Sequence, residues 1–104
     1  MWVSIDLCIV PIGVGTSLSP YIKVCLGIIE EHNLEYELGP NGTAIEGEWD
    51  QVFKCVKSCH EAVHSKGALR IYTTLKVNTR TDKKQLFREK VQSVQNSLNT
   101  NKDR

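Results

Sequence analysis

Long apolar runs and proline are both scarce in this sequence. The longest stretch without Lys, Arg, Asp or Glu runs from Leu7 to Ile22, and two prolines and two glycines interrupt it. Such a stretch is too short and too broken to cross a membrane as a helix. The segment before it carries Asp6 and no basic residue, which argues against a secretion signal. We therefore expect an intracellular, cytoplasmic protein that has no membrane partner.

An excess of charge of either sign is also absent. Lysine and arginine number 13 against 12 acids, so overall charge gives no reason to expect nucleic acid or an anionic membrane as a partner. The two signs are nonetheless segregated along the chain. Residues 1–65 carry 3 basic and 9 acidic side chains, whereas residues 66–104 carry 10 basic and 3 acidic ones. This asymmetry either joins subunits or cancels within one fold.

What remains describes one globular domain over residues 1–104. The 104 residues are 40% hydrophobic and 24% charged, and only 3 prolines and 7 glycines are present, which excludes collagenous or disordered repeats. The four cysteines are Cys8, Cys25, Cys55 and Cys59. In an intracellular chain we expect them to be reduced thiols rather than a disulfide framework.

Hydrophobic periodicity predicts seven elements. They are a strand over Trp2–Val10, a helix from a Ser19 cap and Pro20 to His32–Asn33, a strand over Leu34–Leu38, a strand over Thr43–Glu48, a helix from Trp49–Asp50 to Lys66–Gly67, a strand over Leu69–Thr79, and a last helix opened by Thr81 or Asp82. The first six match the ferredoxin-like βαββαβ pattern. The predicted fold class is therefore α+β, with a four-stranded antiparallel sheet, helices on one face and an additional C-terminal helix. In this topology the first and third strands are central.

The face of the sheet without helices is expected to carry short polar residues at its centre and longer ones around them. The residues expected there are Ser4, Asp6, Cys8, Glu46, Arg70, Tyr72, Thr74, Lys76 and Asn78. One interpretation is an ordinary solvated sheet face. The other is a shallow depression that takes a small ligand or another sheet, in which case buried acids need a cationic partner.

Three segments carry a family resemblance. They are Val10-Pro-Ile-Gly-Val-Gly after the first strand, Gly39-Pro-Asn-Gly-Thr-Ala-Ile-Glu-Gly-Glu-Trp-Asp, and Arg70-Ile-Tyr-Thr-Thr-Leu-Lys-Val-Asn-Thr-Arg on the fourth strand. In these segments, which span nearly the whole chain, the sequence resembles the small YkoF-like thiamine-binding family of ferredoxin-like proteins. The resemblance implies a homodimer joined sheet to sheet, commonly doubled to a homotetramer. It also implies binding of thiamine or its hydroxymethylpyrimidine moiety without conversion, so thiamine is a ligand and no catalytic cofactor is expected.

Thiamine joins an aminopyrimidine to a cationic thiazolium, so its site needs directed polar groups, carboxylates and an aromatic wall. We assign negative charge to Asp6 and Glu46 and a stacking surface to Tyr72 or Trp49. The full set of expected ligand-binding residues is Ser4, Asp6, Asn41, Thr43, Glu46, Tyr72, Thr74, Lys76 and Asn78. Within it, Ser4, Thr43 and Asn78 are assigned hydrogen bonds.

Other chemistries fit the sequence poorly. Cys55-x3-Cys59-His60-x3-His64 matches no common zinc spacing, and both cysteines fall on an apolar helical stripe, so we expect no metal. Gly13-x-Gly15 lacks the Lys-Ser/Thr of a phosphate loop. An RNA-binding sheet of this topology stacks bases on aromatics of its first and third strands, where this chain offers Ser4, Asp6, Cys8 and the acidic segment Thr43–Glu48.

No nucleophile with an adjacent base is apparent, so the chain is not expected to be an enzyme. The alternative is a regulatory or structural oligomer that binds another small metabolite, such as an amino acid.

Overall fold

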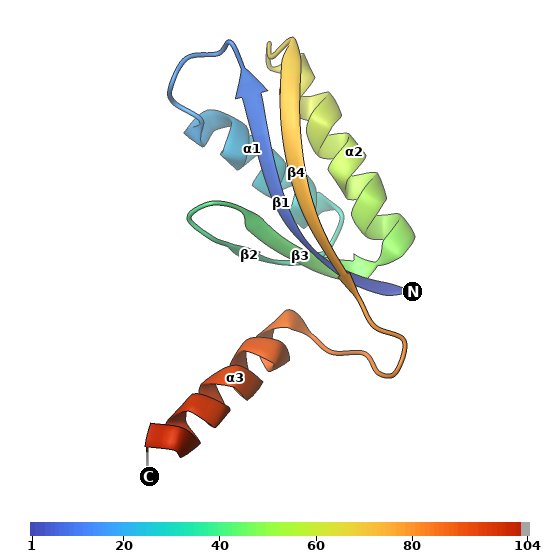
Figure 1. The fold of residues 1–104 in the computed structure, drawn as a ribbon. Coiled ribbons are helices and arrows are strands. Elements are labelled where there is room, and N and C mark those ends of the chain that lie inside the picture. Colours follow the sequence, from blue (N-terminus) through green and yellow to red (C-terminus); the bar gives the residue numbers. More distant parts are fainter. Residues whose placement is uncertain (103–104) are drawn as a thin grey trace.

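The structure is a computed structural model that describes residues 1–102, with side chains described for residues 1–99. Its elements are β1 (Trp2–Ile12), α1 (Ser19–Glu31), β2 (Glu35–Leu38), β3 (Thr43–Glu48), α2 (Trp49–Ser65), β4 (Arg70–Thr79) and α3 (Phe87–Lys102). The strands form one antiparallel sheet in the order β2-β3-β1-β4. α1 and α2 cover one face of the sheet, and α3 lies beyond one end (Figure 1). The predicted α+β ferredoxin-like fold is confirmed.

Alternation along β1 divides the sheet into a covered and an open face. Val3, Ile5 and Leu7 are buried against the helices, and the side chains between them point to the other face. α2 contributes buried residues at helical spacing from Val52 to Val63. Among the described helices, none has both the length and the apolar character that crossing a membrane requires.

The start of α1 differs from the prediction. Ser19 is the first helical residue, Leu18 occupies the cap position, and no side chain caps the helix. The prediction that Ser19 caps this helix was therefore wrong, because Ser19 lies inside the helix. Pro20 still lies in the first turn, where proline is tolerated. The predicted end of α2 is confirmed: Gly67 follows the helix with a φ of 118°, a conformation that favours glycine.

The start of β4 also differs. Leu69 was predicted to begin this strand with its side chain on the core face, but β4 begins at Arg70 and Leu69 is 96% exposed. Ala68, which directly follows the turn at Gly67, lies in the core instead and is 1% exposed.

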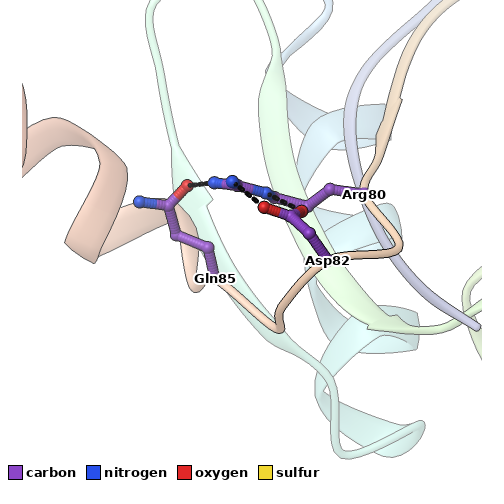
Figure 2. A network of polar contacts seen from close by, with 3 residues as sticks. All are labelled: Arg80, Asp82 and Gln85. Carbon is purple, nitrogen blue, oxygen red and sulfur yellow. Dashed lines mark hydrogen bonds and ion pairs between the residues drawn. The ribbon is translucent and has the colours of Figure 1, made fainter.

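The start of α3 is five or six residues later than predicted. The helix begins at Phe87, not at Thr81 or Asp82. Asp82 cannot cap it, because its carboxylate accepts hydrogen bonds from the Arg80 guanidinium, with Nε at 2.7 Å. Arg80 Nη1 also donates to Gln85 Oε1 at 2.8 Å, so one guanidinium holds both ends of this turn together (Figure 2).

Two glycines provide a matched test of the packing between the sheet and α2. A Cβ at Gly47 on β3 would lie 2.7 Å from Leu34 Cδ2 and 3.3 Å from Val52 Cγ2, both in the core, whereas a Cβ at Gly27 on α1 meets nothing within 4 Å. We expect G47A to lower the free energy of unfolding by about 1–3 kcal/mol. G27A is expected to raise it by about 0.5–1 kcal/mol, because alanine restricts the unfolded chain. Urea denaturation measures both, and an equal effect of the two variants would contradict this packing.

Candidate functional site

The open face is the face of the sheet turned away from α1 and α2. The register places the predicted residues on it together: Ser4 lies opposite Glu46 and Asn78, and Asp6 lies opposite Lys76. The shared face was therefore predicted correctly.

One end of the open face is covered by the segment 80–87, which leads from β4 to α3. The Phe87 backbone N–H donates a hydrogen bond to Glu46 Oε2 at 2.8 Å, and Lys84 Nζ lies 3.8 Å from the centre of the Trp2 ring. Phe87 is itself buried. The expectation that Glu46 is exposed was wrong: this carboxyl is 3% exposed, because the chain returns over it.

Burial raises the pKa of the Glu46 carboxyl above its usual range, and the hydrogen bond from Phe87 opposes that shift without cancelling it. This carboxyl serves the first turn of α3, where a negative group satisfies a backbone N–H that the helix leaves unpaired. Glu46 thus anchors α3 to the sheet and is not open to a ligand in this arrangement. Ser4 and Asn78 lie under the same segment, where they line a small hollow with Arg80 and Lys83.

The remaining part of the open face carries Asp6, Tyr72, Thr74 and Lys76, all exposed. Tyr72 is 65% exposed. The Asp6 carboxylate turns toward the β2–β3 turn, where Oδ1 would lie 2.7 Å from a Cβ at Gly42. Glycine at this position therefore makes room for the carboxylate.

A cavity that was not predicted lies on the other side of the sheet. It has a volume of about 300 Å³ and is bounded by the end of β1, the first turns of α1 and the turn between β2 and β3. We call it the notch cavity. Its lining residues are Leu7, Cys8, Ile9, Val10, Leu18, Tyr21, Ile22, Cys25, Ile29, Leu38, Gly39, Pro40, Asn41, Gly42 and Thr43.

A difference in strand length creates this cavity. β3 pairs with β1 only as far as Leu7, opposite Thr43, whereas β1 continues to Ile12 with β4 as its only partner. Along Cys8–Ile12 the edge of β1 that faces away from β4 therefore has no strand beside it, and main-chain polar groups on such an edge are left for other partners.

The nine predicted ligand-binding residues consequently fall in three places. Ser4, Glu46 and Asn78 lie under the segment 80–87, and Asp6, Tyr72, Thr74 and Lys76 lie on the uncovered part of the open face. Asn41 and Thr43 line the notch cavity, since Thr43 pairs with Leu7 and is buried on the helical side. Asp6 connects two of these places, because Gly42, which it contacts, belongs to the cavity lining.

The aromatic and aliphatic walls of the notch cavity, Tyr21 above all, were missed. Tyr21 follows the predicted helix start, and only a three-dimensional arrangement brings it to the turn at Gly39–Gly42. One sequence signal could have indicated the cavity. The apolar alternation of the first strand continues beyond the residues that the shorter strand Thr43–Glu48 can pair with. Trp49, the alternative stacking residue, packs against Phe53 with ring centroids 4.5 Å apart, outside the cavity.

The buried cysteines of α1 and α2 serve packing. Cys25, Cys55 and Cys59 are buried and free, and Cys59 Sγ donates to the Cys25 carbonyl at 3.8 Å. Hydrogen bonding to Cys25 and Cys55, with burial, raises the pKa of the Cys59 thiol. Within the described residues, no group of three His, Cys, Asp or Glu side chains is arranged to hold a metal ion.

Comparison with known proteins identifies the family. The fold and its notch define a small ferredoxin-like domain, and the model of the thiamine-binding protein family matches residues 5–95. The UPF0045 protein sll0230 of Synechocystis is 48% identical over 98 residues, covering 94% of this chain and 81% of its own. The UPF0045 protein YqgV of Bacillus subtilis is 37% identical over 98 residues, covering 89% and 94%. The chain therefore belongs to the thiamine-binding protein family, as the resemblance predicted.

Solved structures agree on the fold. The hypothetical protein MJ1052 of Methanocaldococcus jannaschii superimposes with a TM-score of 0.82 at 29% identity, covering 89% of this chain and 95% of that one. TM0486 of Thermotoga maritima, described as a candidate thiamine biosynthesis/salvage protein, superimposes with a TM-score of 0.77 at 23% identity, covering 90% and 99%.

The raised pKa of Glu46 predicts a pH dependence of stability. An acid whose pKa is higher in the folded state stabilises the fold below its unfolded pKa, and this contribution is lost as pH rises through the folded pKa. We expect the free energy of unfolding of the wild type, relative to E46Q, to fall as pH rises from about 4 to 7. Urea denaturation across this range measures it, with E61Q correcting for the loss of one acid. A difference that rises with pH would contradict the assignment.

Proposed function

We propose that this protein binds thiamine or its hydroxymethylpyrimidine moiety reversibly, as a homo-oligomer in the cytoplasm, and releases it unchanged. The observation that carries the proposal is the notch cavity in a chain of the thiamine-binding protein family. The four free thiols are compatible with a reducing compartment.

The chemistry of the cavity suits one substituted aromatic ring. Its volume of about 300 Å³ lies at the small end of the usual range for ligand pockets. Apolar side chains form most of its wall, and Tyr21 provides an aromatic surface. The Thr43 hydroxyl, the Asn41 amide and the unpaired edge of β1 offer the donors and acceptors that an aminopyrimidine requires.

The cationic part of thiamine needs a negative group, and Asp6 supplies one. Its carboxylate lies against Gly42, one residue from Thr43, on the open-face side of the turn. A ligand with its pyrimidine ring in the cavity and its thiazolium directed past the turn at Gly42 approaches this carboxylate. We therefore move the proposed site from the centre of the open face to the notch, and we retain Asp6, Asn41 and Thr43 in it.

We propose binding without catalysis because the reactive side chains near the notch cavity lack an activating base. Cys25 lies in the cavity wall but is buried beside Cys59. The histidines of α2 are engaged elsewhere: His60 Nε2 lies 2.7 Å from Thr73 Oγ1, and His64 Nδ1 lies 2.7 Å from the Ala68 carbonyl oxygen.

Exposed apolar surface supports self-association. On α3, Val91, Val94 and Leu98 form a stripe, and each is more than half exposed. A helix of 16 residues is marginal alone in water, so its stripe needs a surface to pack against. A second copy provides that surface in the homodimer or homotetramer that we propose.

Calorimetric titration with thiamine and with hydroxymethylpyrimidine tests the site. We expect T43V to weaken both ligands at least tenfold, because it removes a buried hydroxyl from the cavity and keeps its shape. D6N is expected to weaken thiamine about tenfold and to leave the neutral pyrimidine unchanged. T74V, the same substitution on the open face, is the matched control and is expected to change neither.

Each result has a defined meaning. Weakening by T74V but not T43V would place the ligand on the open face and reject the notch. Heat from an amino acid panel, with none from thiamine or the pyrimidine, would favour the alternative of a regulatory domain for another metabolite. Loss of thiamine over time in the titration cell would reject the non-catalytic assignment.

A further inference from the structure

The small hollow beneath the segment 80–87 is lined by side chains of β1, β4, the segment itself and the start of α3. Its polar lining residues are Trp2, Ser4, Asn78, Arg80, Lys83, Gln85 and Lys90. Three of these described side chains are basic and none is acidic. We therefore call this space the cationic hollow.

Hydrogen-bond donors dominate the cationic hollow. Every polar side chain in its lining can donate, and Trp2, Arg80, Lys83 and Lys90 can only donate. The indole Nε1 of Trp2 is buried and has no hydrogen-bond acceptor among the described residues. A buried N–H without an acceptor is unfavourable and rare in folded proteins. The hollow therefore requires an acceptor that the described side chains do not supply.

Two of the three basic side chains are free to bind that acceptor. The Arg80 guanidinium is held by Asp82, with Nε 2.7 Å from Oδ1 (Figure 2). Lys83 and Lys90 are exposed, and neither forms an ion pair with another described side chain. The hollow thus offers two uncompensated positive charges beside a buried N–H.

One acid lies close to the hollow without entering its lining. Glu46 is opposite Ser4 in the register, and its carboxyl accepts the Phe87 N–H at 2.8 Å. Burial raises the pKa of this carboxyl, so it carries less negative charge than a surface acid near neutral pH. Glu46 therefore opposes an anion in the hollow less than an exposed carboxylate would.

From these observations we infer that the cationic hollow binds one phosphate group, either as the free ion or as the ester of a small metabolite. A phosphate group carries a charge of about −1.5 to −2 near neutral pH, which matches two free lysines, and its oxygens are strong acceptors. The hollow has a volume of about 30 Å³, one water molecule's share of the liquid. One phosphate oxygen therefore enters, and the others stay at the mouth between the lysines.

A phosphate group in this position joins the C-terminal helix to the sheet. It contacts Trp2 on β1 and Lys90 on α3, beside the hydrogen bond between Glu46 and Phe87. A ligand that binds only this arrangement stabilises it as the ligand concentration rises. The site is separate from the notch cavity, and the inference is independent of thiamine binding.

Titration with inorganic phosphate at constant ionic strength tests the site by calorimetry. We expect saturable binding, and acetate is expected to bind at least tenfold more weakly because it carries a single charge. W2F, which keeps an aromatic ring and removes the N–H, and K83Q/K90Q are each expected to raise the Kd for phosphate at least tenfold. K54Q/K57Q removes two charges from exposed positions of α2 and is the matched control, expected to change nothing.

Methyl phosphate distinguishes the two sources of the phosphate group. Binding as tight as that of inorganic phosphate would support a metabolite ester, and binding of inorganic phosphate alone would support the free ion. Absence of saturable phosphate binding by the wild type would overturn the inference and assign a water molecule to the Trp2 N–H. Equal weakening by K54Q/K57Q and K83Q/K90Q would also overturn it, since binding would then follow overall charge. The lysine variants change exposed side chains, so they decide the question even if W2F fails to fold.

Discussion

The unequal lengths of β1 and β3 are the constraint on which the candidate site depends. β1 has 11 residues and β3 has 6, so the central strand loses one of its two neighbours halfway along. The turn between β2 and β3 and the first turns of α1 then border an unpaired strand edge rather than a continuous sheet. A cavity with apolar walls and main-chain polar groups results from this mismatch without any unusual residue.

The segment 80–87 has a comparable influence on the opposite face. Arg80 fixes the turn through Asp82 and Gln85, and Glu46 receives the first backbone N–H of α3. Together these contacts cover the end of the open face that holds Glu46. They leave uncovered the part that begins at Asp6 and Lys76 and continues to Cys8 and Thr74. The part of the open face that stays uncovered is therefore defined by a connection outside the ferredoxin-like unit.

The family was predicted from the resemblance of three sequence segments. Alternation and helical spacing were sufficient to predict the sheet order and the shared face of Ser4, Asp6, Lys76 and Asn78. They could not predict that Glu46 is buried, because its cover comes from residue 87, about forty positions away. Nor could they separate Asn41 and Thr43 from the open face as a site, since that depends on where β3 stops pairing. The late start of α3 was not predicted for a related reason. Aspartate is a residue type that often caps helices, but the Asp82 carboxylate accepts hydrogen bonds from the Arg80 guanidinium instead.

An unpaired strand edge is also a template on which another chain can add a strand and begin to aggregate. In β1 this edge includes Pro11, which pairs with β4 on its other side opposite Ile71. Proline has no N–H to donate, and within a paired strand it is tolerated where that missing donor would face outward. The edge that leaves room for a small ring is thus a poor docking point for a foreign polypeptide backbone.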